Sequence, residues 1–256
     1  MTTANEGSLL SHLAELRSTL LKCVGTILVI FLALIYFARD IYHWLATPLM
    51  VHLPEGTSMI ATDVGAPFFA PFKLTMVVAV AAAVPFLLHQ VWRFIAPGLY
   101  KHEKRLIAPL LISSTLLFYG GIAFAYYVVL PLAFAFFTTM APEGITIATD
   151  ITSYLNFVLK IFFAFGIAFE IPVAILLLCW TGAVTPAQLR ANRSYVIVGA
   201  FVVGMLLTPP DVISQTLLAV PMWLLFELGL VFARFYTPES NVLKEKNSTS
   251  KDSESV

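Results

Sequence analysis

Long apolar runs constrain this chain more than any other feature of its sequence. An α-helix rises about 1.5 Å per residue, so about 20 apolar residues are needed to cross the roughly 30 Å hydrocarbon layer of a membrane. Six apolar runs, of which the fifth is the shortest, occur at residues 18–38, 72–91, 106–129, 155–180, 195–208 and 212–232. The sequence therefore predicts an all-α polytopic membrane protein with six transmembrane helices.

The composition supports this class and excludes others. Of the 256 residues, 59% are hydrophobic and 12% are charged, whereas a soluble domain is roughly half apolar and about a quarter charged. This balance excludes an ordinary cytosolic enzyme, a nucleic-acid-binding protein and a disordered regulator. The two cysteines, Cys23 and Cys179, lie inside apolar runs, so they predict neither a disulfide nor a zinc site. We expect no metal and no cofactor.

The distribution of basic residues predicts how the runs are oriented. If the N-terminus is cytoplasmic, 12 of the 15 basic residues fall on the inner side, as the positive-inside rule requires. The remaining three, Arg39, Lys73 and Lys160, lie toward the outer edges of their spans. Both termini are therefore predicted to be cytoplasmic. Lys160 is expected to extend its ammonium group outward to the interface.

Segments outside the spans have their own signatures. The fifth run has 14 residues and ends at Pro209-Pro210, which predicts short fifth and sixth helices in a tight hairpin that need not cross the full bilayer. The aromatic stretch at residues 41–44 predicts a short helix on the outer interface. Residues 1–236 are predicted to form the membrane domain, and the polar residues 237–256 a disordered cytoplasmic tail.

Two acids on the predicted cytoplasmic side are candidates for binding a cation. Glu15 lies on the polar face of an amphipathic helix, and Glu103 lies in a loop that is otherwise basic. A carboxylate near the interface binds a guanidinium bidentately and more strongly than in bulk water. The structural alternatives are that Glu15 belongs to a simple amphipathic lead-in and that Glu103 neutralises its lysine neighbours.

Glu170 lies deep in the fourth span, beside Pro172, which is expected to bend the helix. An ionisable residue there is costly and is a functional hypothesis by default. One alternative is a protonated side chain that hydrogen-bonds to a neighbouring helix. Another is the proton site of a proton-coupled small-solute transporter. An intramembrane hydrolase is disfavoured because no paired nucleophile and base occur, and the nucleotide-binding, zinc and serine-hydrolase motifs of soluble enzymes are absent.

A polar stripe joins the last two spans. Met205, Thr208 and Gln215 flank the Pro-Pro turn, and Asp211 lies at its tip. Polar side chains in lipid usually hydrogen-bond across helices. They either tie the hairpin to itself or dock a membrane helix of another subunit.

Five sequence blocks in this order resemble the TatC family, the core subunit of the Sec-independent twin-arginine protein translocase. The resemblance extends from Leu9 to about Tyr236 and is closest to the TatC proteins of Gram-negative bacteria. The blocks are HLAELR at residues 12–17, IATDVGAPFF at 60–69, FIAPGLYKHEKR at 94–105, FEIPV at 169–173 and LLTPPDVISQ at 206–215.

The resemblance implies a cup-shaped bundle of six helices in the cell inner membrane and a transport function without enzymatic activity. In the family, TatC binds twin-arginine signal peptides on the cytoplasmic side. With other TatC copies and the single-span subunits TatA and TatB, it exports folded proteins using the proton motive force. Membrane lipids are the remaining expected partner, and nucleic acid is not expected.

The resemblance also implies roles for individual residues. The acids that bind the twin arginines would be Glu15 and Glu103. The family's loop motif often has arginine where this chain has Lys104, which keeps the charge. The residues that line or support the site would be Leu9, Arg17, Phe94 and Leu99. The residues that dock the TatB or TatA helix would be Met205, Thr208 and Gln215, and the further functional positions Pro48, Phe68, Glu170 and Asp211.

Overall fold

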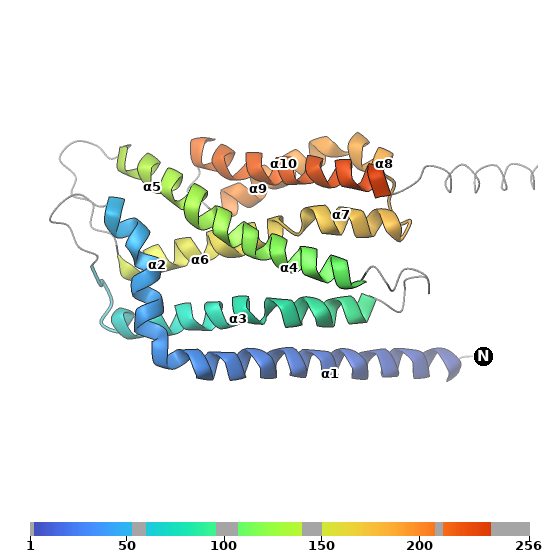
Figure 1. The fold of residues 1–256 in the computed structure, drawn as a ribbon, viewed down its shortest axis with the longest axis horizontal. Helices are drawn as coiled ribbons and strands as arrows, with labels where there is room; N and C mark the ends of the chain where they lie inside the picture. The colour runs from blue at the N-terminus through green and yellow to red at the C-terminus, as the bar shows by residue number, and fades with distance from the viewer. Residues whose placement is uncertain (1–2, 53–59, 96–106, 140–149, 208–211, 237–256) are drawn as a thin grey trace, which may run out of the picture. The chain divides into compact units, whose positions relative to one another are not determined.

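The computed structural model describes residues 3–52, 60–95, 107–139, 150–207 and 212–236, and these ranges contain helices but no β-strand (Figure 1). The predicted tail, residues 237–256, lies outside the described residues. In chain order, the elements are α1 (Thr3–Leu34), η1 (Ile35–Phe37), α2 (Ala38–His52), α3 (Ala66–Ile95), α4 (Ile107–Phe124), η4 (Ala125–Val129), α5 (Leu130–Thr139), α6 (Ile151–Ala168), α7 (Ile171–Trp180), α8 (Pro186–Ala191), α9 (Arg193–Leu207) and α10 (Val212–Tyr236).

The helices are apolar and long enough to confirm the predicted membrane fold. Five stretches meet the requirements for a membrane span: Ala14–Leu45, Ala66–Arg93, Ala108–Phe137, Ile151–Trp180 and Gln215–Phe235. The predicted short fifth helix is α9, whose 15 residues extend about 22 Å. The prediction of a short sixth helix was wrong, because α10 has 25 residues and continues past Phe232 to Tyr236. Its polar residues Glu227 and Arg234 do not end it, since a helix satisfies its own backbone.

The chain forms two compact units, residues 1–166 (unit 1) and residues 167–256 (unit 2). In unit 1, α1 packs along α3, α2 packs on α3 and α5, and α3 packs on α4. Figure 1 shows α1 and α3 side by side, with α2 running across the end of α1. The helix predicted at residues 41–44 is therefore present as part of α2. Because α1 and α3 are antiparallel, the beginning of α1 lies beside the end of α3.

Hydrogen bonds fasten the end of unit 1 at which α3 and α6 begin, which we call the latch end. The amide of Ile151 donates to the carbonyl of Ile60 over 2.9 Å. The Asp150 carboxylate accepts the Thr62 amide (3.1 Å) and hydroxyl (2.9 Å), and the Ser153 amide (2.9 Å). The buried Tyr154 hydroxyl donates to the carbonyl of Leu45 in α2 over 3.0 Å. Segments far apart in sequence are thus held at fixed positions.

The third span changes helical type near the latch end. Between α4 and α5, the five residues Ala125–Val129 form a π-helical turn. Tyr126 in this turn stacks on Trp44 of α2, with ring centroids 5.2 Å apart and ring planes 6° apart. The π turn therefore occurs where the span meets an aromatic partner from another helix.

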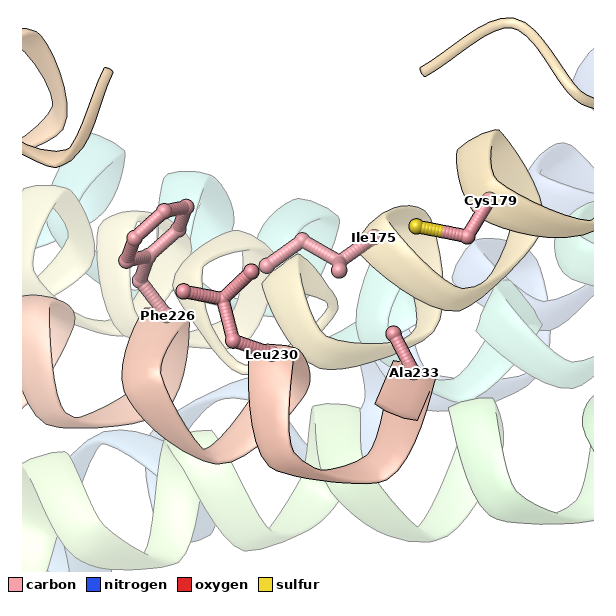
Figure 2. Packing of buried hydrophobic residues seen from close by; sticks show 5 residues of the cluster. All are labelled: Ile175, Cys179, Phe226, Leu230 and Ala233. Atoms are coloured by element: carbon pink, nitrogen blue, oxygen red, sulfur yellow. The ribbon is translucent and has the colours of Figure 1, made fainter. Parts of the chain in front are cut away.

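In unit 2, α7 and α9 both pack on α10. Figure 2 shows the buried cluster between α7 and α10, which consists of Ile175, Cys179, Phe226, Leu230 and Ala233. The helices approach closely because α10 has a glycine at position 229: a Cβ there would lie 2.9 Å from the Pro172 Cα. Cys179 is a small apolar core residue here, and it forms no disulfide.

The fourth span is interrupted where Pro172 predicts a bend. Helix α6 ends at Ala168, and α7 begins at Ile171 with proline in its first turn. Glu170 lies at the N-cap of α7, and its carbonyl accepts the amide of Ala174 over 2.9 Å. The break therefore places an acid at the start of a half-helix inside the span.

Candidate functional site

The opposite end of unit 1 has a polar cavity between α1 and α3, which we call the pocket end. The cavity has a volume of about 180 Å³. Its lining is unusual for a membrane helix pair, because it contains one acid, two bases and three uncharged polar side chains. These residues are Glu15, Ser18, Thr19 and Lys22 from α1, and Gln90 and Arg93 from α3.

Helical spacing brings these side chains together. Glu15, Thr19 and Lys22 are four and three residues apart in α1, so they share one face of the helix. Gln90 and Arg93 are three residues apart and share one face of α3. The antiparallel packing of α1 and α3 turns the two polar stripes toward the same space.

Burial differs sharply among the lining residues. Gln90 is only 6% exposed, whereas Glu15, Lys22 and Arg93 are exposed. Within the described part of the chain, no ion pair joins Glu15 to either base. The charged groups therefore lie at the accessible part of the cavity, and the amide of Gln90 lies in its interior.

This arrangement suits a ligand that is recognised by its hydrogen bonds. The Glu15 carboxylate offers two acceptor oxygens, which match the planar fork of a guanidinium. The Gln90 amide can donate and accept. Because Lys22 and Arg93 line the same cavity, a cation gains little from the net charge and must align with the carboxylate. Such a site discriminates by geometry.

The remaining residues predicted for this site are only partly visible. Arg17 is exposed and lines a neighbouring groove on α1 with Leu21 and Lys22. Leu9 lies in α1 and Phe94 in α3, but their side chains are outside the described residues, as are Leu99 and Glu103 altogether. The pairing of Glu15 with Glu103 around one ligand stays a prediction.

At the latch end, the structure places one predicted residue. Phe68 lies in the first turn of α3, is 69% exposed, and contacts the Phe69 ring edge to face at 5.3 Å. Pro48 lies in α2, but its side chain is outside the described residues, and Asp211 is not described. Phe68 therefore offers an exposed aromatic surface, and the roles of all three residues stay predictions.

In the hairpin of α9 and α10, Gln215 is bound to its own hairpin. Its Nε2 donates to the carbonyl of Phe201 over 2.8 Å. A Cβ at the buried Gly204 would lie 3.2 Å from the Gln215 Cγ, so glycine allows this close approach. Met205 is 50% exposed, and Thr208 lies outside the described residues. The predicted hydrogen bond within the hairpin is thus present. Docking of another subunit stays a prediction.

Two residues that sequence reasoning did not single out are important in the structure. Gln90 is a lone amide in an apolar run, one turn before Arg93, and only the neighbouring α1 reveals its place in the cavity. Asp150 precedes an apolar run, which is an N-cap signal. The hydrogen bonds from the amides of Ser153 and Thr62, and then from the Thr62 hydroxyl, lower the pKa of Asp150 to about 2.

Comparison with known proteins agrees with the fold. A family model described as Sec-independent protein translocase protein (TatC) matches residues 11–221. The Sec-independent protein translocase protein TatC of Haemophilus influenzae is 60% identical over 240 residues, which cover 94% of this chain and 94% of that protein. The protein of the same name from Escherichia coli K12 is 58% identical over 254 residues, which cover 99% of this chain and 98% of that protein.

A solved structure is similar as well. The crystal structure of a "Twin Arginine Translocase Receptor- TatC" is 40% identical in sequence and superposes with a TM-score of 0.79. The similarity covers 89% of this chain and 100% of that chain. Sequence and structure therefore agree that this chain belongs to the TatC family of Sec-independent protein translocase proteins.

Proposed function

We propose that this protein is the receptor subunit of a twin-arginine translocase in the bacterial inner membrane. As a TatC-family protein, it is a membrane transport component and not an enzyme. The specific proposal is that it binds twin-arginine signal peptides from the cytoplasm. With TatA and TatB, it then exports folded proteins, driven by the proton motive force. The observation that carries this proposal is the exposed Glu15 carboxylate on a polar cavity that also contains the buried Gln90.

The chemistry of two adjacent arginines fits the pocket end. A single exposed carboxylate binds a cation weakly in water. Glu15 in α1 and Glu103 in the segment after α3 would each supply one carboxylate, one for each guanidinium. Leu9, Arg17, Phe94 and Leu99 are proposed to line or support the site. Lysine in place of arginine loses the planar fork, so recognition depends on arginine itself.

The orientation of the pocket end follows from charge. Placing both termini in the cytoplasm puts 12 of the 15 basic residues on that side. Arg93 in the last turn of α3 is one of these residues. The pocket end would then open to the cytoplasm, where signal peptides arrive, and the latch end would face the outer side. Labelling of single cysteines from each side of the membrane tests this assignment.

We propose that the hairpin of α9 and α10 docks the TatB or TatA helix through Met205, Thr208 and Gln215. Half of the Met205 side chain is exposed, and the Gln215 amide oxygen accepts no hydrogen bond from a described residue. Gln215→Leu is expected to reduce co-purification of TatB. The matched control is Val203→Leu, a change at an exposed position of α9. Unchanged TatB recovery in Gln215→Leu contradicts the proposal.

Site-specific photocrosslinking in inside-out vesicles tests the receptor function. A probe is placed beside the arginines of a signal peptide, and Arg-Arg is compared with Lys-Lys. We expect arginine-dependent crosslinks to the region of Glu15 and Glu103, and their loss in Glu15→Ala and in Glu103→Ala. Equal crosslinking of both peptides, or wild-type crosslinking in both variants, contradicts the proposal.

A further inference from the structure

Two lysines and an asparagine form a polar stripe on the exposed surface of α3 and α6. The ammonium of Lys73 in α3 donates a hydrogen bond to the Asn156 Oδ1 in α6. Lys160 follows Asn156 by four residues, so it lies one turn further along the same face of α6. Both lysines are exposed, and Asn156 is partly buried between them. The stripe combines residues from helices that are 83 residues apart in sequence.

The depth of the stripe follows from helix length. Helix α3 has 30 residues and extends about 45 Å, which is about 15 Å more than the hydrocarbon layer. If the excess is shared equally, about 7 Å projects at each end. Lys73 is seven residues after Ala66, about 10 Å along α3, so its Cα lies only about 3 Å inside the hydrocarbon layer.

Lys160 lies deeper but points the same way. It is nine residues after Ile151, about 14 Å along α6. Asn156 accepts the hydrogen bond of Lys73, and Lys160 is four residues further along α6, so the Lys160 Cα lies about 6 Å deeper than the Asn156 Cα. Both helices begin at the latch end, and helical side chains lean toward the N-terminus of their helix. Both ammonium groups can therefore reach the phosphate level of the leaflet at this end.

No described carboxylate of unit 1 pairs with these cations. Neither lysine forms an ion pair with a described carboxylate. Two described acids lie just before α3 and α6: Asp150 accepts hydrogen bonds from Thr62 and Ser153 on its two oxygens, and the exposed Asp63 accepts the Gly65 amide over 3.3 Å. An ammonium at this depth is costly unless an anion accompanies it. The membrane itself supplies such a group, the phosphate of a lipid.

We propose that Lys73, Asn156 and Lys160 bind the phosphate diester of an anionic phospholipid in the leaflet at the latch end. The Lys73 ammonium has three N–H groups, of which one bonds to Asn156 and two are left for phosphate oxygens. The Asn156 Oδ1 is occupied, so its NH2 group is the part available to donate to the phosphate. Lys160 provides the second positive charge.

The two cations also determine which lipid is preferred. A zwitterionic lipid such as phosphatidylethanolamine brings its own ammonium group, which the two lysines repel. Phosphatidylglycerol carries one negative charge and no headgroup cation. Because the site holds two positive charges and no described acid, it selects the lipid without a cation. The proposal goes beyond the receptor function, which determines only that this leaflet is the outer one.

Native mass spectrometry of the full-length protein from mixed micelles tests the site. The lipid probes are phosphatidylglycerol and phosphatidylethanolamine at equal concentration, and inorganic phosphate is added in a separate arm. Two lost ionic contacts of exposed lysines, each worth about threefold, correspond to about a tenfold loss of affinity. We therefore expect about tenfold less bound phosphatidylglycerol in Lys73→Gln/Lys160→Gln than in the wild type, with phosphatidylethanolamine unchanged. The single variant Lys160→Gln changes only an exposed side chain, so its smaller loss does not depend on folding of the double variant.

The control is Arg39→Gln, which removes another exposed cation at the beginning of α2. It is expected to retain phosphatidylglycerol as the wild type does. Equal lipid retention in the double variant and the wild type overturns the proposal, as does an equal loss in Arg39→Gln. Displacement of the lipid by inorganic phosphate would assign the site to free phosphate. Unchanged lipid retention with loss of TatB would assign the cations to an acidic protein partner, and this too would overturn the proposal.

Discussion

The two ends of unit 1 lie at opposite ends of α3, and their polar groups are used in opposite ways. At the latch end, Asp150, Thr62 and Tyr154 form hydrogen bonds that join α2, α6 and the segment before α3. At the pocket end, Glu15 and Arg93 line one cavity without an ion pair between them in the described part of the chain. At the latch end, the polar groups hydrogen-bond to one another. At the pocket end, they stay accessible to a ligand.

This difference indicates which end of unit 1 is held rigidly and which end can bind a ligand. A carboxylate that accepts three protein hydrogen bonds has little capacity left for a ligand. A carboxylate without an internal ion pair can exchange water for a guanidinium. Fixing one end of α3 also limits the movement of the other, because a helix transmits position along its length. The latch end is thus expected to support the pocket end without touching the ligand.

Substitution of Glu15 gives the largest expected effect and tests the receptive end. Glu15→Ala removes the acid of the cavity, and loss of a bidentate charge-assisted contact of about 1.5–3 kcal/mol corresponds to roughly a tenfold or greater fall in affinity. Signal-peptide crosslinking is expected to fall accordingly, while the thermal midpoint of the purified protein stays unchanged. Glu15→Asp should restore part of the binding. Asp40→Asn, at an exposed acid of α2, is the control.

Substitution of Gln90 should have a smaller effect on the same readout. Gln90→Leu keeps the volume of this buried side chain but removes its donor and acceptor. We expect severalfold weaker crosslinking than in the wild type, with unchanged dependence on the two arginines. Wild-type crosslinking in Gln90→Leu would show that the amide is only a packing residue of the helix pair.

Asp150→Ala tests the rigid end. The substitution removes the acceptor for the amides of Ser153 and Thr62 and for the Thr62 hydroxyl. We expect Tm in detergent to fall by several degrees, with signal-peptide binding largely kept. Asp40→Ala is the matched control, since this acid is exposed on α2. A loss of signal-peptide binding in Asp150→Ala as large as in Glu15→Ala would contradict the inference that only the pocket end binds the ligand.

The pH dependence of the Tm difference between the wild type and Asp150→Ala tests whether the Asp150 carboxylate is its source. The folded-state pKa of Asp150 is about 2, below its ordinary value of 3.8. A depressed pKa means that the carboxylate stabilises the fold fully above about pH 4 and loses this contribution as the pH falls toward 2. The difference in Tm between the wild type and Asp150→Ala should therefore be constant from pH 5 to pH 8 and shrink in acid. A difference that already shrinks between pH 7 and pH 5 would exclude Asp150 as its source.

Thr62→Val is the smallest change and tests one bond of the latch. It removes the hydroxyl that donates to Asp150 over 2.9 Å but keeps the backbone amide bond. The fall in Tm should be smaller than that of Asp150→Ala. In a double variant, the two effects should not add, because both act through one carboxylate. Full additivity would show that the hydroxyl acts elsewhere.

The sequence predicted the membrane fold because run length and apolar content determine whether a helix can span. It also predicted a bend beside Glu170 from Pro172, where the structure has a break between α6 and α7, since proline cannot continue the hydrogen-bond ladder of a helix. The sixth span was predicted to end at residue 232, whereas α10 continues to Tyr236, because a helix tolerates a charged residue such as Arg234 near an interface.

The candidate site was predictable only in part. Glu15 was identifiable because it lies on the polar face of an amphipathic helix and within a family motif. Gln90 was not, since its meaning depends on α1 being beside α3. The latch was also invisible in the sequence: Thr62 and Asp150 are 88 residues apart, and no local pattern links them. Contacts of this kind follow from tertiary packing.

The π turn at Ala125–Val129 determines how the third span of this protein tolerates a change in length. Each residue of an α-helix advances the side-chain direction by about 100°, and a π turn accommodates one extra residue within an otherwise regular helix. Removal of one residue from this turn would restore regular winding with both halves of the span close to their present directions, whereas removal of one residue from α4 would rotate one half by about 100° relative to the other. A single-residue deletion within Ala125–Val129 should therefore be less harmful than a single-residue deletion within α4.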